Sequence, residues 1–158
     1  MQVITPLGNA RKVPENTYNP EYCVFVSANA GSGKTTLLVN RVLALLLAGV
    51  LPHKILCLTY TNAAAAEMTQ RVSKILSQWV MMPDDTLRLQ LEPLIERAPD
   101  IALLAHARSL FAQVIDAPVG LRMHTIHGFC QSLLARFPLE AGVGLGLNVL
   151  DDRSRNHL

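Results

Sequence analysis

The stretch ANAGSGKTT at residues 28–36 decides the fold. The apolar run CVFV precedes it at 23–26, and leucines and valines follow it at three- and four-residue steps as far as Ala48. These patterns predict a buried strand over 22–27 and a helix over 35–48. A glycine-rich turn between a strand and a helix can point successive backbone N–H groups into one concavity, at the positive end of the helix dipole. We therefore expect an anion site in this turn.

The side chains of the turn indicate which anion it would hold. Residues 28–35 match the pattern G-x-x-x-x-G-K-[ST] with one departure, because Ala28 stands in place of the first glycine. Lys34 is expected to approach the β- and γ-phosphates of a nucleotide, and Thr35 to offer its hydroxyl to Mg²⁺. Hydrolysis also needs an acidic residue after a second strand. Asp116 and Asp151 follow only short apolar runs, and we interpret Asp151 as part of a surface turn, so the predicted nucleotide site is incomplete.

The remaining patterns predict an α/β fold. A second buried strand is expected over 54–61, and Asn62 is placed to cap a helix that starts with four alanines and runs to about Val80. Gly49 is placed to end the first helix. Strand, helix, strand and helix in this order predict a βαβ unit in a parallel sheet with helices on its faces. The other expected elements are an irregular lead-in over 1–20, two helices within 83–118 separated at Pro93 and Pro99, a short strand over 121–126 and a helix over 127–137.

Composition limits the function classes. The chain has 158 residues, of which 50% are hydrophobic and 16% charged, as expected for one domain with a buried core. Its formal net charge of +2 gives no general attraction to nucleic acid, so any DNA contact must come from a local site. Cys23, Cys57 and Cys130 are odd in number and widely spaced, and we interpret them as buried free thiols of a reducing compartment. No signal peptide opens the chain, and the apolar run at 42–51 is too short to span a bilayer, which predicts a soluble cytoplasmic protein without membrane contact.

Two further motifs carry polar groups next to predicted helix starts. In TYTN at 59–62, hydroxyl and amide groups could hold a phosphate of a nucleic-acid backbone, and Tyr60 could stack on a base; the alternative is an ordinary helix cap with Tyr60 in the core. In HTIHGFC at 124–130, two histidines and a cysteine have the spacing of zinc ligands, but a second ligand pair is missing. We interpret this second motif as a segment that does not bind a metal ion.

Taken in order, the segments ANAGSGKT, LCLTYTNAAAAEM and MHTIHGFCQSLL resemble motifs I, Ia and Ic of the UvrD/Rep-like superfamily 1 DNA helicases. The pattern is most similar to the AddA type, the helicase–nuclease subunit of bacterial double-strand-break repair, which also carries alanine at the position of Ala28. The resemblance runs from about residue 19 to the end. It implies a P-loop NTPase fold, with residues 21–158 as an incomplete N-terminal, RecA-like ATP-binding domain.

The resemblance also implies roles for individual residues. Lys34 and Thr35 would be the catalytic residues, with Mg²⁺ on Thr35. Thr125 and His127 would touch DNA. The complete sets implied are Ala28, Gly31, Ser32, Gly33, Lys34, Thr35 and Thr36 for the triphosphate of ATP, and Thr59, Tyr60, Thr61, Asn62, Thr125 and His127 for single-stranded or double-stranded DNA. An AddB-like partner subunit is implied for a full-length protein.

The chain departs from this family in two respects. These helicases usually place a glutamine before motif I to recognise adenine, and residues 14–20 contain none. A second RecA-like domain, an acidic metal motif and arginines that reach ATP are also missing. We therefore expect an N-terminal piece of a helicase that does not unwind DNA alone. Two alternatives are another P-loop NTPase and a non-catalytic module that binds nucleotide or single-stranded DNA.

Overall fold

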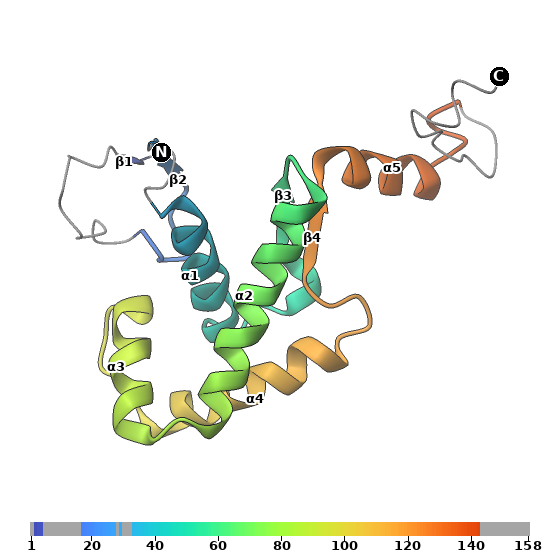
Figure 1. The fold of residues 1–158 in the computed structure, drawn as a ribbon. Coiled ribbons are helices and arrows are strands. Elements are labelled where there is room, and N and C mark those ends of the chain that lie inside the picture. Colours follow the sequence, from blue (N-terminus) through green and yellow to red (C-terminus); the bar gives the residue numbers. More distant parts are fainter. Residues whose placement is uncertain (1, 5–16, 28, 30–32, 143–158) are drawn as a thin grey trace.

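The computed structural model describes the backbone of residues 2–4 and all atoms of residues 17–27, 29 and 33–142. The described residues form helices together with short parallel strands, which confirms the α/β class (Figure 1). In chain order the elements are β1 (Gln2–Ile4), β2 (Val24–Val26), α1 (Lys34–Leu47), the 3₁₀ helix η1 (Pro52–Lys54), β3 (Leu56–Thr59), α2 (Asn62–Met81), α3 (Asp84–Ile95), α4 (Ile101–Asp116), β4 (Arg122–Thr125) and α5 (Ile126–Arg136). No helix among these is long and apolar enough to cross a membrane.

The described strands form two separate parallel pairs rather than one sheet. β1 pairs with β2, and β3 pairs with β4 in a register that sets Leu56 opposite Arg122 and Thr59 opposite Thr125. The predicted parallel orientation of the strands is therefore confirmed. The predicted βαβ unit is not formed among the described strands, since β2 and β3 lie in different pairs. The strand at residues 2–4 was also not expected, because it lies within the predicted irregular lead-in.

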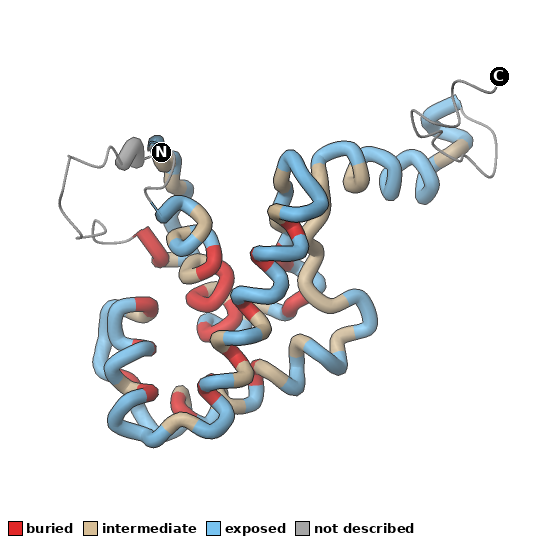
Figure 2. Tube along the Cα trace, viewed as in Figure 1, coloured by how far each residue is buried: buried red, intermediate tan, exposed pale blue. Residues whose placement is uncertain are grey.

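The hydrophobic core lies between α1, α2, α3 and α4 (Figure 2). Each of these helices contributes large apolar side chains that are almost fully buried, at the three- and four-residue spacing of an amphipathic helix. These include Leu43 and Leu46 of α1, Val72, Leu76 and Trp79 of α2, Leu87 and Leu91 of α3, and Leu104 and Leu110 of α4. Leu38, which the sequence pattern placed on the buried face of α1, is 49% exposed.

The strands are less buried than the sequence predicted. Phe25 of β2 is 53% exposed, and Leu56 and Leu58 of β3 are 43% and 46% exposed. α2 packs on one face of the β3–β4 pair, where the Thr69 hydroxyl lies 3.2 Å from the sulfur of Met123. Leu56 and Leu58 alternate with the residues on that face and so lie on the other one.

The cysteines are also more accessible than expected. Cys23 and Cys130 are exposed, and Cys57 is partly buried. Cys23 stands directly before β2, whose hydrogen-bonded neighbour among the described strands is β1 alone. Cys130 lies on α5, a helix without a buried residue. The prediction of three buried thiols was therefore wrong for these two.

The helix ends follow the sequence with two corrections. Gly49 has φ +83° and ends α1, with its N–H donating to the Leu46 carbonyl at 2.9 Å, as predicted. Thr61 rather than Asn62 caps α2, since its hydroxyl accepts the Ala64 N–H at 3.1 Å. Pro93 lies inside α3 instead of breaking it. α3 ends two residues later, so few helical hydrogen bonds follow the proline.

Candidate nucleotide and nucleic-acid site

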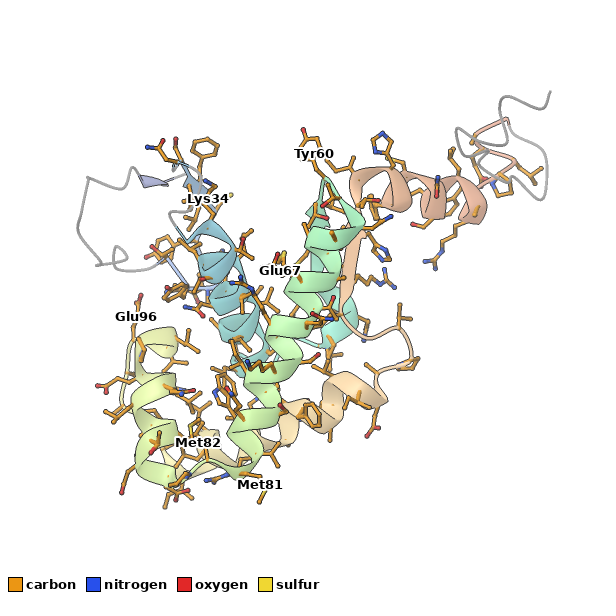
Figure 3. The ribbon with its side chains drawn as sticks, viewed as in Figure 1. Lys34, Tyr60, Glu67, Met81, Met82 and Glu96 are labelled. Atoms are coloured by element: carbon orange, nitrogen blue, oxygen red, sulfur yellow. The ribbon has the colours of Figure 1, made fainter. Side chains whose placement is uncertain are left out.

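Gly33 makes the sharp turn into α1. Its φ of +87° and ψ of 18° are left-handed, a conformation that glycine adopts without strain. As the N-cap residue it offers no side chain to the first N–H groups of the helix, and no side-chain cap bond is present. The positive end of the helix dipole at this terminus favours an anion. Lys34 is the first residue of α1, and Figure 3 shows it at that end of the helix.

The Lys34 side chain reaches back across the turn. Its Nζ donates a hydrogen bond to the Asn29 carbonyl at 2.6 Å, so the cation stays beside the loop that precedes α1. Thr35 is partly buried and Thr36 is exposed. Ala28, Gly31 and Ser32, which the resemblance assigns to the triphosphate, lie outside the described residues, as does Asp151.

The second predicted group lies where β3 leads into α2. The Thr59 hydroxyl donates to the Thr61 carbonyl at 3.0 Å, which fixes the turn between strand and helix. Tyr60 is 87% exposed at the tip of this turn (Figure 3), so it is not part of the core. Thr61 caps the helix, and Asn62 is exposed in its first turn. The accessible ring of Tyr60 is available for stacking.

Thr125 and His127 lie beside this turn. The register of the β3–β4 pair places Thr125 next to Thr59, and the Thr59 hydroxyl is 3.5 Å from the His124 carbonyl. The Thr125 hydroxyl caps α5 by accepting the Gly128 N–H at 3.1 Å. A Cβ at position 128 would lie 3.1 Å from that hydroxyl, so a side chain there would require the Thr125 hydroxyl to shift by a few tenths of an ångström. His127 is exposed in the first turn of α5.

The structure thus gathers Thr59, Tyr60, Thr61, Thr125 and His127 at one edge. This edge is formed by the carboxyl ends of two parallel strands and the amino ends of the helices that follow them. In open α/β sheets ligands bind at such an edge, and two helix starts favour anionic groups such as phosphates. The chemistry available here is hydrogen bonding and stacking, because no acidic residue follows β2, β3 or β4 directly.

The described residues offer no metal cluster at this site. No group of three or more histidine, cysteine, aspartate or glutamate side chains that could hold a metal ion occurs among them. Burial raises the pKa of the Cys57 thiol on β3 above its usual value. Cys57 faces the helical core, so this shift reflects packing rather than catalysis.

Sequence reasoning missed two residues that hold the segment before β2. The Arg41 guanidinium donates to the Thr17 carbonyl at 2.8 Å, to the Asn19 carbonyl at 3.2 Å and to the Tyr22 carbonyl. The Asn40 side chain donates to the Tyr18 hydroxyl at 3.2 Å. The only signal in the sequence is a polar pair, Asn40 and Arg41, within the otherwise apolar run from Leu37 to Leu47.

Comparison with known proteins identifies similar sequences over most of the chain. Residues 10–158 match the family described as UvrD/REP helicase N-terminal domain. The chain is 32% identical over 135 residues to the ATP-dependent helicase/nuclease subunit (AddA) of Lactobacillus gasseri, covering 85% of this chain and 9% of that protein. It is 45% identical over 129 residues to the protein of the same name from Lactobacillus helveticus, covering 82% and 9%. It is 36% identical over 117 residues to the protein of the same name from Desulforudis audaxviator, and this match covers 72% of this chain and 8% of that protein. The chain therefore spans about 9% of the length of the curated relatives it matches first.

Proposed function

Because the chain belongs to the UvrD/REP helicase N-terminal domain family, we propose that it supplies the ATP-binding segment of a DNA helicase. The observation that carries this proposal is the geometry of Gly33 and Lys34. A left-handed glycine leads into a helix whose first N–H groups have no side-chain cap, and a lysine opens that helix. This arrangement suits a phosphate chain.

In this proposal ATP is bound as its Mg²⁺ complex in a P-loop. Lys34 neutralises charge on the β- and γ-phosphates, and Thr35 provides a hydroxyl for the metal. Ala28, Gly31, Ser32, Gly33 and Thr36 complete the cradle with backbone and side-chain donors. Upon binding, Lys34 exchanges its bond to the Asn29 carbonyl for a charge-assisted bond to phosphate, which is the stronger interaction.

We assign the edge formed by Thr59, Tyr60, Thr61, Asn62, Thr125 and His127 to DNA. Its exposed hydroxyls and helix starts suit backbone phosphates, and the exposed ring of Tyr60 suits an unstacked base. Contact through stacking favours single strands, since paired bases offer no free ring face. ATP-driven movement along one DNA strand would then require coupling between the ATP site and the DNA edge. This coupling would pass through α1 and α2, which are in contact.

The relatives suggest the wider setting. They are named as helicase/nuclease subunits, which supports DNA as the substrate. A role in double-strand-break repair with an AddB-like second subunit is our proposal from the resemblance of the motifs. We further propose that these 158 residues alone do not unwind DNA. No acidic residue directly follows any of the described strands. The carboxylate that would orient the attacking water must therefore come from elsewhere.

The lack of an acidic residue directly after the described strands also supports a second candidate function. Without an acid, residues 33–142 could act as a non-catalytic module that binds nucleotide or single-stranded DNA. Such a module would bind DNA with strong salt dependence and would not respond to ATP if the loop held no phosphate.

One titration tests the proposal. Binding of a fluorescent ATP analogue with Mg²⁺ is measured for the unaltered chain, Lys34→Ala and the control Lys74→Ala, which removes an exposed lysine of α2. We expect Lys34→Ala to weaken binding by about tenfold or more, since charge-assisted bonds to phosphate are lost, and Lys74→Ala to leave it unchanged. Equal binding by all three proteins would contradict the proposal. A parallel titration with an oligothymidylate detects a pure DNA binder.

A further inference from the structure

We propose that Arg41 is a positioning residue that fixes β2, and with it the phosphate loop, against α1. The contacts of Arg41 are a property of the fold, whereas their consequence for nucleotide binding rests on the proposed function. Three features of the molecule support this role: the carbonyls that Arg41 holds, the sparse packing of β2, and the bonds from α1 to the backbone on both sides of β2.

Arg41 holds the whole turn that leads into β2. Its guanidinium reaches the carbonyls of Thr17, Asn19 and Tyr22, the last of which lies two residues before the strand. Guanidinium is suited to this task because its donors project in a fixed planar fork and stay charged at all physiological pH values. A lysine could not satisfy three carbonyls in the same directions.

Packing contributes little to the position of β2. Among the described strands β2 is bonded only to β1. Cys23, which precedes β2, and Phe25, in its centre, are both exposed. On the side of the turn that faces the end of α3, a cavity of about 590 Å³ is lined by Asn19, Pro20 and Glu21. Burial is confined to Thr17 and Tyr18, and Asn40 adds a bond to the Tyr18 hydroxyl. Hydrogen bonds from α1 therefore hold this segment.

Side chains of α1 hold the backbone on both sides of β2. Lys34 binds the Asn29 carbonyl beside the loop, and Arg41, about two helical turns further on and on the same face of α1, binds the Tyr22 carbonyl before β2. α1 thus bonds to the backbone both before and after β2. Loss of the Arg41 contacts would let the strand end move relative to the helix start, and a phosphate cradle requires both in one geometry.

Hydrogen–deuterium exchange of the chain without nucleotide tests the positioning role directly. Arg41→Met keeps most of the aliphatic stem and removes the donors. The control Arg71→Met removes an arginine that pairs with Glu67 on the exposed face of α2. We expect peptides spanning residues 17–36 to exchange about tenfold faster or more in Arg41→Met, with peptides of α2 and α4 unchanged, and no change at 17–36 in Arg71→Met. Unchanged exchange at 17–36 in Arg41→Met would overturn the inference.

The consequence for nucleotide is read from the same proteins. If the unaltered chain binds Mg²⁺–ATP, Arg41→Met should bind about tenfold more weakly while the fluorescence of Trp79 in the core stays native. Arg41→Lys should fall between them, since its ammonium keeps the charge and three donors on one nitrogen but lacks the planar fork that reaches three separate carbonyls. Equal affinity of Arg41→Met would overturn the link to the loop. If the unaltered chain binds no nucleotide, the proposed function fails, and the exchange experiment alone decides the positioning role.

Discussion

At the scale of single residues, Cys57 is set apart from the other two cysteines by its surroundings. Its side chain packs against the helical core, and burial raises its pKa, whereas Cys23 and Cys130 are exposed. The thiolate is the reactive form, so a buried thiol with a raised pKa reacts slowly. We expect 5,5′-dithiobis(2-nitrobenzoic acid) near pH 8 to modify two thiols quickly and the third slowly. Cys57→Ser should remove the slow phase; three equal rates would contradict the packing of β3 on the helices.

The same shift predicts a dependence of stability on pH. Because the pKa of Cys57 is raised in the folded chain, the native state keeps this proton over a pH range in which the unfolded chain has lost it. The contribution of Cys57 therefore makes the free energy of unfolding fall as the pH rises above about 8.5, the usual thiol value, until the folded-state pKa is passed. Urea titrations between pH 7 and about pH 10 should show that the free energy of unfolding falls less with pH in Cys57→Ser than in the unaltered chain. In Cys130→Ser the free energy of unfolding should fall as much as in the unaltered chain.

At the scale of elements, α2 and α5 begin in the same way but are supported differently. Threonine hydroxyls cap both, Thr61 for α2 and Thr125 for α5. α2 buries Met68, Val72 and Trp79, among others, while α5 buries no residue. A lost cap costs about 1 kcal/mol of helix stability. For α2 this loss must appear in global unfolding, because the helix cannot separate without opening the core.

We therefore expect removal of the cap to destabilise the whole chain at Thr61 but only the local helix at Thr125. Thr61→Ala should lower the free energy of unfolding by about 1 kcal/mol, measured by Trp79 fluorescence in urea. Thr125→Ala should leave that value unchanged and instead accelerate hydrogen exchange within α5. Thr61→Ser and Thr125→Ser keep an acceptor oxygen and serve as controls. A global loss in Thr125→Ala would show that α5 is coupled to the core.

The elements also show how far local patterns predict this fold. The bounds of α1 and α2, the end of α1 at Gly49 and the strand β4 follow from periodicity and turn residues, which act within a few residues. The pairing of β3 with β4 could not be predicted, because it joins segments separated by three helices. For the same reason the sequence does not decide whether Tyr60 is buried or open to stacking, since only the tertiary structure shows it exposed.

The candidate site was predictable in part. Gly33 and Lys34 lie where the motif required them, because a strand–loop–helix turn is local. The resemblance assigns both Thr59 and Thr125 to DNA, whereas their proximity is given only by the register of the strands. Arg41 could not be identified, because its carbonyl partners precede it by about twenty residues and carry no side-chain signal.

At the scale of the whole molecule, stability is expected to reside in the helices. Apolar runs predicted buried strands, but a hydrophobic strand is buried only where other elements cover it, and α2 covers one face of the β3–β4 pair. The near-complete burial of Leu43 between packed helices contrasts with Leu58, which is 46% exposed on the other face of that pair. Equal apolar side chains thus contribute unequally to folding.

The corresponding prediction compares three identical substitutions. Leu43→Ala should destabilise the chain by about 2–5 kcal/mol, because it removes apolar contacts and leaves a cavity in the core. Leu58→Ala should cost less than about 1 kcal/mol, and so should Leu38→Ala, which truncates an exposed leucine on the same helix as Leu43. Urea unfolding followed by helical circular dichroism measures all three. A loss for Leu58→Ala as large as that for Leu43→Ala would mean that the second face of the β3–β4 pair is covered in solution, and the strands would then belong to the core, as their apolar sequences predict.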